Sequence, residues 1–417
     1  MVLIYGKGTT GQSLARFMER NEIPHILRDD EDFSEDDLEK VSLIVISPGI
    51  PFYHNIYRLA RKKGIEIIGD IEYAYRLYRG KIFAITGTDG KSTTTYILGE
   101  LLKKENPFVG GNYGQPFINA VLNKNPVAVL ELSSFQIYAT QTFRPNTGVL
   151  LNVSVDHLDW HKRESHYLLS KYKMFKRMGR ENTAILNLDQ EIIQRVKIQA
   201  DRYYFSMERL PRNLEGIYHC GQFLIYKIKN KTGKIDITDF KLEGVHNIQN
   251  LMAASLAAMI HGVSPEEIEE VIPNLKPLPY RIQPVGEVKG VRFYNDSKST
   301  TIQSVEKAVA SFKDSRVILI IGGIYKGGDF SVLLKYPNIK KIIIYGRDRQ
   351  VLKQMLEDRK DIVLLKETLE DSVKEAYRQA EKGDVVLFSP GCSSFDMFKN
   401  YRERGEVFNK LVESIGK

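Results

Sequence analysis

The chain contains only two cysteines among its 417 residues, and it has no long apolar run. Because Cys220 and Cys392 lie in unlike sequence surroundings, neither a disulfide framework nor a cysteine-rich metal site is predicted. No segment approaches the roughly 18 consecutive apolar residues that a membrane-spanning helix needs. The N-terminus, MVLIYGKGTTG, lacks the basic start and the small-residue cleavage site of a secretory signal. We therefore expect a protein of the reducing cytoplasm that does not cross a membrane.

Dense basic segments are also missing, although the net charge is +8. A positive balance can attract nucleic acid, an anionic membrane or phosphorylated small molecules, and the charge alone does not choose among them. Lysine and arginine are spread among many acidic residues, and the chain has no RNA-binding signature. An ordinary solvated surface is the favoured interpretation, and we expect no nucleic-acid partner.

Apolar runs typical of strands alternate with helical patterns through most of the sequence, which predicts parallel sheets covered by helices. The chain is too long for one hydrophobic core. A new strand follows Gly80, and a proline-containing stretch from Pro273 to Pro284 has the composition of a linker. We therefore predict three domains, at residues 1–80, 81–278 and 279–417. Within the second, the segment 216–240 predicts an antiparallel hairpin with its turn near Lys231 to Gly233.

The segment IFAITGTDGKSTTTYILGELL carries the sharpest chemical signal. A strand leads into a glycine-containing turn, and Lys91 and Ser92 then open a helix. The glycines let the backbone approach an anion, the helix start directs N–H groups at it, Lys91 can reach the β- and γ-phosphates, and the Ser92 hydroxyl can bind Mg²⁺. The longer phosphate-loop pattern has glycine where Ile85 stands, so this is the short GTxGK[ST] form. The predicted ATP-binding loop comprises Gly87, Thr88, Asp89, Gly90, Lys91, Ser92 and Thr93.

Two further strands of the second block end in polar residues. The apolar strand in VAVLEL ends at Glu131, and GVLLNVSV is followed by Asp156 and His157. Strand ends of an open α/β sheet meet at the ligand crevice, so Glu131 and His157 are candidate Mg²⁺ ligands. Each alone is more typical of a loop, but both follow a phosphate loop in chain order. Lys171 lies in a lysine-rich helix, where composition indicates only a surface charge.

The N-terminal GKGTTG, from Gly6 to Gly11, matches a dinucleotide fingerprint, with Asp29 and Asp30 about twenty residues later. It raises the alternative of NAD binding. The block is short and shows few strands, so a phosphate or pyrophosphate, such as that of a UDP group, is the favoured ligand.

The third block has polar clusters after three apolar strands: FYNDSKSTT, GGIYKGGDF and SPGCSSFDMFKNYRERGEVF. Helix capping is a competing explanation for Asp296, Ser297, Ser393 and Ser394. Three such clusters on one sheet nevertheless indicate a binding face for a carboxylate or nucleotide ligand.

These motifs, together with ELSSFQ, GVHNIQN and LPYRI, resemble the Mur ligase family in order and approximate spacing over nearly the whole chain. Members of that family use ATP to add amino acids to peptidoglycan precursors. The resemblance implies an α/β fold of three domains. These are a small Rossmann-like N-terminal domain, a central P-loop ATPase-like α/β domain with an antiparallel hairpin or sheet, and a C-terminal Rossmann-like α/β domain.

Within the family, NDSKST, SPGCSSFDMFKN, SPGIP and GDIE are most similar to the members that join D-glutamate to UDP-N-acetylmuramoyl-L-alanine through an acyl phosphate. Folylpolyglutamate synthases and other Mur ligases are the nearest alternatives. An NAD-dependent oxidoreductase and a non-catalytic nucleotide-binding regulator belong to different classes.

The resemblance also implies roles for individual residues, with ATP and Mg²⁺ as cofactors and a monomeric protein. It assigns catalysis to Lys91, His157 and Lys171, and metal binding to Ser92, Glu131, His157 and a carbamylated Lys171. It adds Asn247, Arg281 and Asp296 to the ATP site. It assigns the UDP-substrate to Thr9, Thr10, Ser47, Gly49 and Asn112, and D-glutamate to Lys298, Thr300, Lys326, Ser394 and Tyr401. Arg28 and Asp29 stand where an aspartate–threonine pair is expected, so the uridine contacts depart from the family pattern.

Overall fold

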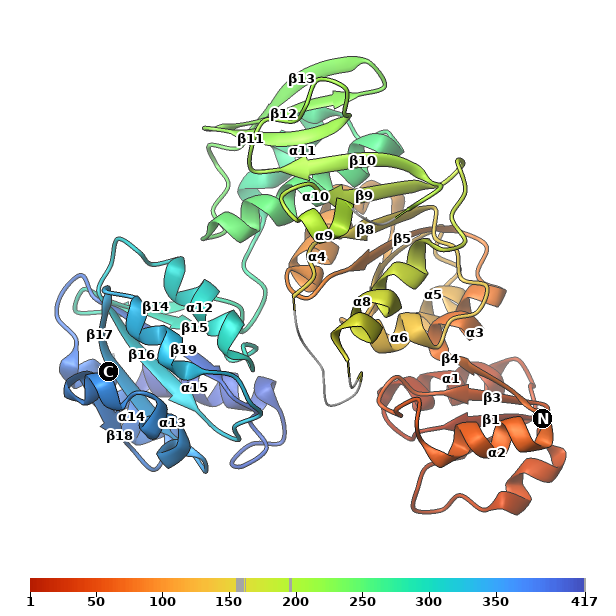
Figure 1. The fold of residues 1–417 in the computed structure, drawn as a ribbon, viewed down its shortest axis with the longest axis horizontal. Coiled ribbons are helices and arrows are strands. Elements are labelled where there is room, and N and C mark those ends of the chain that lie inside the picture. Colours follow the sequence, from red (N-terminus) through yellow and green to blue (C-terminus); the bar gives the residue numbers. More distant parts are fainter. Residues whose placement is uncertain (155–160, 162, 195–196, 416–417) are drawn as a thin grey trace. The chain divides into compact units, whose positions relative to one another are not determined.

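The computed structural model describes residues 1–154, 161, 163–194 and 197–415. It divides into two compact units, residues 1–240 with 246–275 and residues 241–245 with 276–417. Three sheets follow one another along the chain, which confirms the predicted α/β class (Figure 1). The domain boundaries near residues 80 and 278 stay a prediction.

The first sheet is parallel, with strand order β2-β1-β3-β4. Its strands are β1 (Val2–Tyr5), β2 (His25–Arg28), β3 (Leu43–Ile46) and β4 (Glu66–Gly69), and its helices are α1 (Thr9–Arg20), η1 (Glu35–Lys40), α2 (Asn55–Lys63) and α3 (Asp70–Leu77). Leu3 and Ile4 are both fully buried although they point to opposite faces. A parallel sheet covered on both faces explains why β1 is continuously apolar instead of alternating.

The second sheet has nine strands in the order β13-β12-β11-β10-β9-β8-β5-β7-β6. The strands are β5 (Lys81–Thr86), β6 (Phe108–Gly111), β7 (Val127–Glu131), β8 (Thr147–Leu150), β9 (Thr183–Asn187), β10 (Asp201–Ser206), β11 (Gly216–Cys220), β12 (Phe223–Ile228) and β13 (Lys231–Asp236). The helices are α4 (Lys91–Leu101), η2 (Lys103–Glu105), α5 (Ile118–Leu122), α6 (Ser134–Tyr138), α8 (Glu164–Tyr172), η3 (Lys173–Phe175), α9 (Glu191–Gln194), α10 (Val245–His261), α11 (Pro265–Val271) and η4 (Ile272–Asn274). One apolar cluster includes Ile4 from the first sheet and Leu130 from the second, so the two sheets pack into one unit.

The predicted hairpin is present as three strands, since β11 pairs with β12 and β12 with β13 in antiparallel register. Its predicted turn near Lys231 was wrong. Ile228 pairs with Lys231, and the turn is Lys229–Asn230, both with positive φ (48° and 64°). Positive φ at both central residues matches the strand twist of a two-residue hairpin turn. Asparagine tolerates positive φ better than most residues.

The sheet of the second unit has the order β14-β15-β19-β16-β17-β18, with only β14 antiparallel to its neighbour. Its strands are β14 (Gln283–Val288), β15 (Val291–Asn295), β16 (Val317–Gly322), β17 (Ile339–Tyr345), β18 (Val363–Leu365) and β19 (Val385–Gly391). Its helices are α12 (Ile302–Ala310), η5 (Phe330–Lys335), α13 (Arg349–Met355), η6 (Glu357–Ile362), α14 (Leu369–Gln379) and α15 (Tyr401–Ile415). The strands β15, β19 and β16 are direct neighbours, so the three polar clusters predicted from sequence follow adjacent strands.

Helix α3 is tied to the loop before β8 by the buried carboxylate of Glu72. It accepts hydrogen bonds from the backbone N–H groups of Gln141 and Phe143 (2.8 and 3.1 Å) and from the Thr142 hydroxyl (2.6 Å). Arg76 also donates to it, at 3.1 Å. Burial alone would raise the pKa of Glu72, but these hydrogen bonds outweigh burial and lower the pKa.

We expect Glu72→Gln to destabilise the protein by about 2–3 kcal/mol at pH 7, because the new amide N–H would face existing donors. A carboxyl whose folded pKa is lowered stabilises the fold above its unfolded pKa, so the loss should shrink as the pH falls below about 4. Urea denaturation at pH 7 and at a pH below about 4 measures this loss in the free energy of unfolding. Glu66→Gln is the matched control, since Glu66 pairs with the same Arg76 at the surface (2.7 Å). A change of less than about 1 kcal/mol is expected there, and an equal loss in both variants would contradict the prediction.

The first residue of α3, Asp70, shows the opposite shift. Burial raises its pKa to about 6, although Gln136 donates to one carboxylate oxygen at 3.3 Å. The other oxygen, Oδ1, has no hydrogen-bond partner. Since the folded pKa is raised, ionised Asp70 destabilises the fold, and the cost appears as the pH rises from about 4 to about 6.

We expect Asp70→Asn to raise the Tm at pH 8 and to leave it nearly unchanged at pH 4. The gain corresponds to about 3 kcal/mol from roughly two pKa units. Thermal melts at the two pH values test this. The exposed Asp314→Asn serves as control and should show no pH-dependent gain. A Tm for Asp70→Asn that does not rise at pH 8 would refute the assignment.

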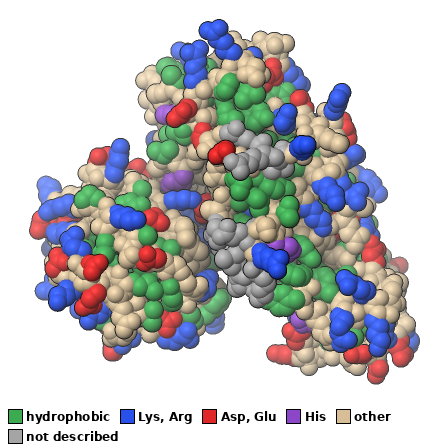
Figure 2. Space-filling view, viewed as in Figure 1, with side chains coloured by type: hydrophobic (Ala, Val, Ile, Leu, Met, Phe, Trp, Pro, Cys, Tyr) green, Lys and Arg blue, Asp and Glu red, His purple; other side chains and the backbone are tan. Residues whose placement is uncertain are grey.

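Among the described residues, no helix combines the length and apolar composition that a bilayer crossing requires. Basic and acidic side chains are interspersed over the surface in view in Figure 2.

Candidate active site

The phosphate loop connects β5 to α4, as predicted. Gly90 lies in the left-handed region (φ 81°) immediately before α4. A Cβ atom there would lie 2.2 Å from Asn250 Oδ1, so both the conformation and the space require glycine. The Lys91 ammonium donates to the carbonyls of Gly87 and Thr88, at 3.0 and 2.7 Å. No side chain caps α4, and the start of a helix is a position where backbone N–H groups can bind a phosphate.

The loop is held by two asparagines that the sequence analysis did not single out. Asn152, just after β8, accepts from the backbone N–H groups of Thr88 and Asp89 (3.0 and 2.8 Å) and donates to the Asp89 carbonyl (3.1 Å). Asn250 on α10 accepts from the Thr94 hydroxyl at 3.2 Å and donates to Asn247 at 3.1 Å. The predicted ATP-site residue Asn247 is therefore linked to α4 through the side chain of Asn250. The only sequence signal for Asn152 was its position, directly after a strand and shortly before other motif residues.

Glu131, Ser92 and Asn112 form a connected group at the ends of β7, α4 and β6. The Ser92 hydroxyl donates to Glu131 Oε2 at 2.5 Å, and Asn112 Nδ2 donates to Glu131 Oε1 at 2.6 Å. Glu131 is only 3% exposed. A carboxylate and a hydroxyl side by side at the phosphate loop are the oxygen donors that Mg²⁺ prefers, so these residues fit the ion. Asn112, predicted for the UDP-substrate, contacts the predicted metal ligand.

Lys171 on α8 is buried, at 1% exposure. The prediction from composition that it is a surface charge was therefore wrong. Its ammonium donates to the Gly87 carbonyl at 2.7 Å and lies 4.5 Å from the centre of the Tyr167 ring. The Tyr167 hydroxyl in turn hydrogen-bonds the Thr88 hydroxyl at 3.0 Å. Helix α8 therefore directs Lys171 at the phosphate loop. His157 lies outside the described residues.

A buried histidine that sequence reasoning missed lies close to this helix. His161 hydrogen-bonds the Ser134 hydroxyl at 2.8 Å and His166 at 2.9 Å. The His166 ring lies 4.9 Å from Phe52, which follows β3 of the first sheet. This group of side chains links the first sheet to the helices beside the phosphate loop.

The predicted UDP-binding residues flank two loops of the first sheet. Ser47, after β3, donates to the Gly6 carbonyl after β1 at 3.2 Å. Thr9 and Thr10 open α1, and Gly49 lies two residues beyond Ser47. Both loops follow the carboxyl ends of neighbouring parallel strands, where ligands of open α/β sheets bind.

The acidic residues required by the NAD interpretation are engaged elsewhere. Asp29 lies 3.6 Å from the Lys7 ammonium. Asp30 accepts from the Tyr5 hydroxyl at 2.6 Å and lies 3.0 Å from His54. Arg28, which differs from the family pattern at this position, pairs with Asp37 at 3.1 Å.

In the second unit, Asp296 is buried after β15. Burial raises its pKa to about 6, against hydrogen bonds from the hydroxyls of Ser299 (2.6 Å) and Ser389 (2.7 Å). It also accepts from the Ile282 N–H at 3.2 Å, which ties it to the segment containing Arg281. The capping explanation for Asp296 and Ser297 was wrong, because Thr301 caps α12.

The predicted D-glutamate residues gather at the carboxyl ends of β15, β19 and β16. The Lys298 ammonium lies 4.1 Å from the centre of the Tyr401 ring. Gly391 donates to the Ser299 carbonyl at 3.1 Å, next to Thr300. Ser393, the neighbour of buried Ser394, pairs with Ile324 at 2.9 Å in both directions. Lys326 lies exposed in the same loop as Ile324.

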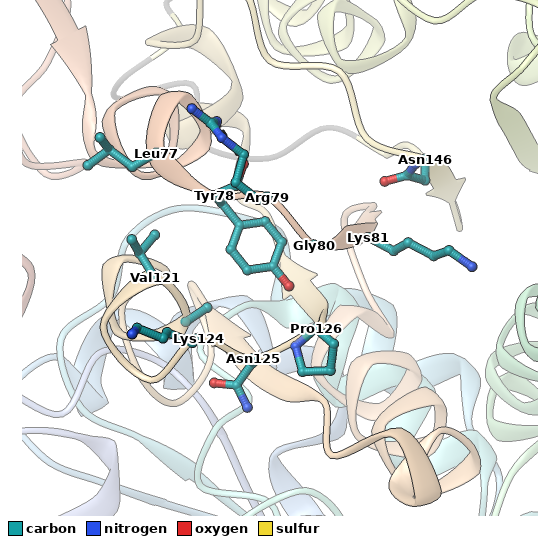
Figure 3. Close-up of a pocket in the computed structure, with 11 residues that line it drawn as sticks. Leu77, Tyr78, Arg79, Gly80, Lys81, Val121, Lys124, Asn125, Pro126 and Asn146 are labelled. Atoms are coloured by element: carbon teal, nitrogen blue, oxygen red, sulfur yellow. Dashed lines mark hydrogen bonds between the residues drawn. The ribbon is translucent and has the colours of Figure 1, made fainter.

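A cavity of about 600 Å³ lies at the opposite end of β5 from the phosphate loop. Figure 3 shows the Tyr78 ring among the residues that surround it, and none of the predicted site residues lines it. Its walls are Leu77, Tyr78, Arg79, Gly80, Lys81, Ala120, Val121, Lys124, Asn125, Pro126 and Asn146. Ligands of parallel sheets bind at the carboxyl ends of strands, so this cavity is separate from the candidate active site.

Two family profiles match the chain. The profile of the Mur ligase middle domain matches residues 85–258, and that of the Mur ligase glutamate ligase domain matches residues 280–392. The chain belongs to the Mur ligase family. Several similar curated proteins are named UDP-N-acetylmuramoylalanine--D-glutamate ligase. That from Aquifex aeolicus is 41% identical, and that from Hydrogenobaculum sp. is 39% identical. Each match covers 99% of this chain and 98% of the relative.

Solved structures share the fold at much lower identity. A UDP-N-acetylmuramate-alanine ligase from Thermotoga maritima has a TM-score of 0.65 at 16% identity, over 99% of both chains. A MurF ligase from the same organism in complex with ADP has a TM-score of 0.63 at 17% identity, over 99% of this chain and 95% of the other. These matches confirm the fold predicted from the sequence.

Proposed function

We propose that this chain joins D-glutamate to UDP-N-acetylmuramoyl-L-alanine in an ATP-dependent reaction that releases ADP and phosphate. The observation that carries the proposal is the convergence of Lys91, the Ser92–Glu131 pair and buried Lys171 on one phosphate loop. The near full-length likeness to D-glutamate ligases supports the choice of substrates.

The reaction needs ATP because a carboxylate is a poor acceptor for an amine. The γ-phosphoryl group would pass to the L-alanyl carboxylate, which forms an acyl phosphate and leaves ADP. The amine of D-glutamate would then attack the acyl carbon, and the bond to the phosphate oxygen would break to release inorganic phosphate. The amine must first lose a proton, for which His157 is a candidate acceptor.

Within this reaction, the phosphate loop supplies positive charge where the transferred group becomes more negative. Lys91 would exchange the Gly87 and Thr88 carbonyls for phosphate oxygens, and the first N–H groups of α4 would bind others. Thr93 belongs to the same helix start. Asn152 and Asn250 keep the loop in place while these partners change.

Ser92, Glu131, His157 and Lys171 are the proposed metal ligands. Bound Mg²⁺ would neutralise charge on the transferring phosphoryl group. For Lys171 we propose carbamylation, in which the amine nitrogen bonds to the carbon of CO₂ and releases a proton. The product carries a carboxylate in place of the cation. Burial supports this modification, since an ammonium loses hydration there.

The remaining predicted contacts complete the proposal. Asn247, Arg281 and Asp296 would contribute to ATP binding, and Thr9, Thr10, Ser47, Gly49 and Asn112 to UDP-substrate binding. Lys298, Thr300, Lys326, Ser394 and Tyr401 would bind D-glutamate, whose two carboxylates suit the two lysines. We place the reaction in the cytoplasm, where ATP is available, and propose a monomer.

Phosphate release from ATP tests the function, with UDP-N-acetylmuramoyl-L-alanine and one of four amino acids: D-glutamate, L-glutamate, meso-diaminopimelate or L-lysine. Release together with a product mass gain for D-glutamate alone is the expected result. Activity with another amino acid would assign a different Mur ligase reaction. If none supports release, the UDP-substrate is wrong, and folate with L-glutamate becomes the next pair to test.

A further inference from the structure

Arg404 is the largest fully buried side chain in the described part of the protein, at 0% exposure. It lies one turn inside α15, and all three of its guanidinium nitrogens are used. Nε donates to the Ser297 hydroxyl at 3.0 Å, Nη2 to the Ser297 carbonyl at 2.8 Å, and Nη1 to the Cys392 carbonyl at 3.0 Å. The side chain therefore joins the loop after β15 to the loop after β19.

Among the described residues, no carboxylate forms an ion pair with this guanidinium, whose three nitrogens donate to two carbonyls and one hydroxyl. A buried cation without a counter-ion is costly, and an apolar side chain of similar volume would avoid that cost. The guanidinium carbon lies 6.0 Å from the centre of the Phe388 ring. Packing alone does not account for an arginine here.

Both loops that Arg404 joins carry proposed D-glutamate residues. Ser297 precedes Lys298, and the Ser297 hydroxyl donates to the Tyr401 carbonyl at 2.8 Å. Cys392 lies two residues before Ser394. The three hydrogen bonds of Arg404 thus fix, relative to one another, the segments that present Lys298, Tyr401 and Ser394.

We propose that Arg404 is a positioning residue for the acidic amino acid, because its three hydrogen bonds hold these segments in register. The inference rests on the proposed function. Arg404 acts through Ser297 and Cys392, and its role is distinct from those of the residues proposed to touch the substrate.

Steady-state kinetics of Arg404→Met and Arg404→Lys test the proposal, with the KM for D-glutamate, the KM for ATP and kcat measured separately. We expect Arg404→Met to raise the KM for D-glutamate about 10- to 100-fold, as expected for lost hydrogen bonds to a charged group, with the KM for ATP changed less than about threefold. Arg404→Lys keeps the charge but cannot bond all three acceptors. Its KM for D-glutamate should therefore lie between that of the wild type and that of Arg404→Met. A KM for D-glutamate within about threefold of the wild type in both variants would overturn the proposal.

Phe408→Leu is the matched structural control. Phe408 lies on the same helix, is fully buried, and stacks on Phe388 with ring centres 4.6 Å apart. Its side chain takes no part in the hydrogen bonds that join the two loops. It should lower the Tm without selectively raising the KM for D-glutamate. The proposal is overturned if Arg404→Lys and Phe408→Leu lower the Tm alike and both keep the wild-type KM.

A second variant keeps the test valid if Arg404→Met does not fold. Ser297→Ala removes one acceptor of the guanidinium and should raise the KM for D-glutamate several-fold, whereas an unchanged KM would count against the proposal. Failure of the proposed function looks different, because the wild-type protein would then show no dependence on D-glutamate at all.

Discussion

Lys91→Met should reduce phosphate release by about a thousandfold or more, the largest effect that we expect from a single substitution. Methionine has a similar length but no charge, so the phosphate loop would lose the cation that now bonds Gly87 and Thr88. The fold should remain, because the Gly87 carbonyl still accepts from Lys171 and Thr88 is only partly buried. The measurement is initial-rate phosphate release at saturating D-glutamate and UDP-N-acetylmuramoyl-L-alanine, with a thermal melt of each protein.

Lys103→Met provides the control for this substitution. Lys103 follows the same helix, but its side chain is 76% exposed and pairs with Glu100 at 3.3 Å. Its activity should stay within about twofold of wild type, as expected for a surface ion pair. Retention of more than a tenth of wild-type activity by Lys91→Met would show that the phosphate loop does not serve catalysis.

Glu131→Gln should cause the second largest loss, about a hundredfold in kcat at a fixed Mg²⁺ concentration, together with a higher Mg²⁺ requirement. The carboxylate accepts from Ser92 and Asn112 on its two oxygens, so an amide can keep only one of these arrangements. It also removes the negative charge that would hold the ion. Rates measured against Mg²⁺ concentration separate weaker metal binding from a slower reaction.

Glu105→Gln is a suitable comparison, because Glu105 is 41% exposed and pairs with His261 at 2.9 Å, away from the phosphate loop. Its Mg²⁺ dependence should match the wild type. If Glu131→Gln also shows an unchanged Mg²⁺ dependence, Glu131 is not a metal ligand and the structural pairing with Ser92 explains its burial.

The phosphate loop was predictable because every part of it is contiguous: strand, turn, lysine, hydroxyl and helix follow within about twenty residues. The strands β5, β7 and β16 were equally clear, since burial on both faces demands continuous apolar runs. The resemblance to the Mur ligase family rested on such local motifs, and the likeness to curated relatives confirms it.

Residues that act through distant partners could not be recognised in the same way. Lys171 lies in a lysine-rich helix, and nothing in its neighbourhood shows that this side chain faces Gly87, 84 residues earlier. Asn152 and Arg404 are ordinary polar residues until the loops that they join are known. The exact turn of the hairpin was missed because positive φ at Lys229 has no sequence signal.

By itself, the sequence determined the α/β class, the position of the phosphate loop and the family, because these depend on burial pattern and on residues adjacent in the chain. Only the tertiary structure decided which side chains meet. The order β15-β19-β16 brings together three clusters separated by many residues, and the order β8-β5-β7 places Asn152 and Glu131 on either side of the phosphate loop. Strand order is a property of the packed sheet: crossover helices and shared apolar faces select it, and no local propensity encodes it.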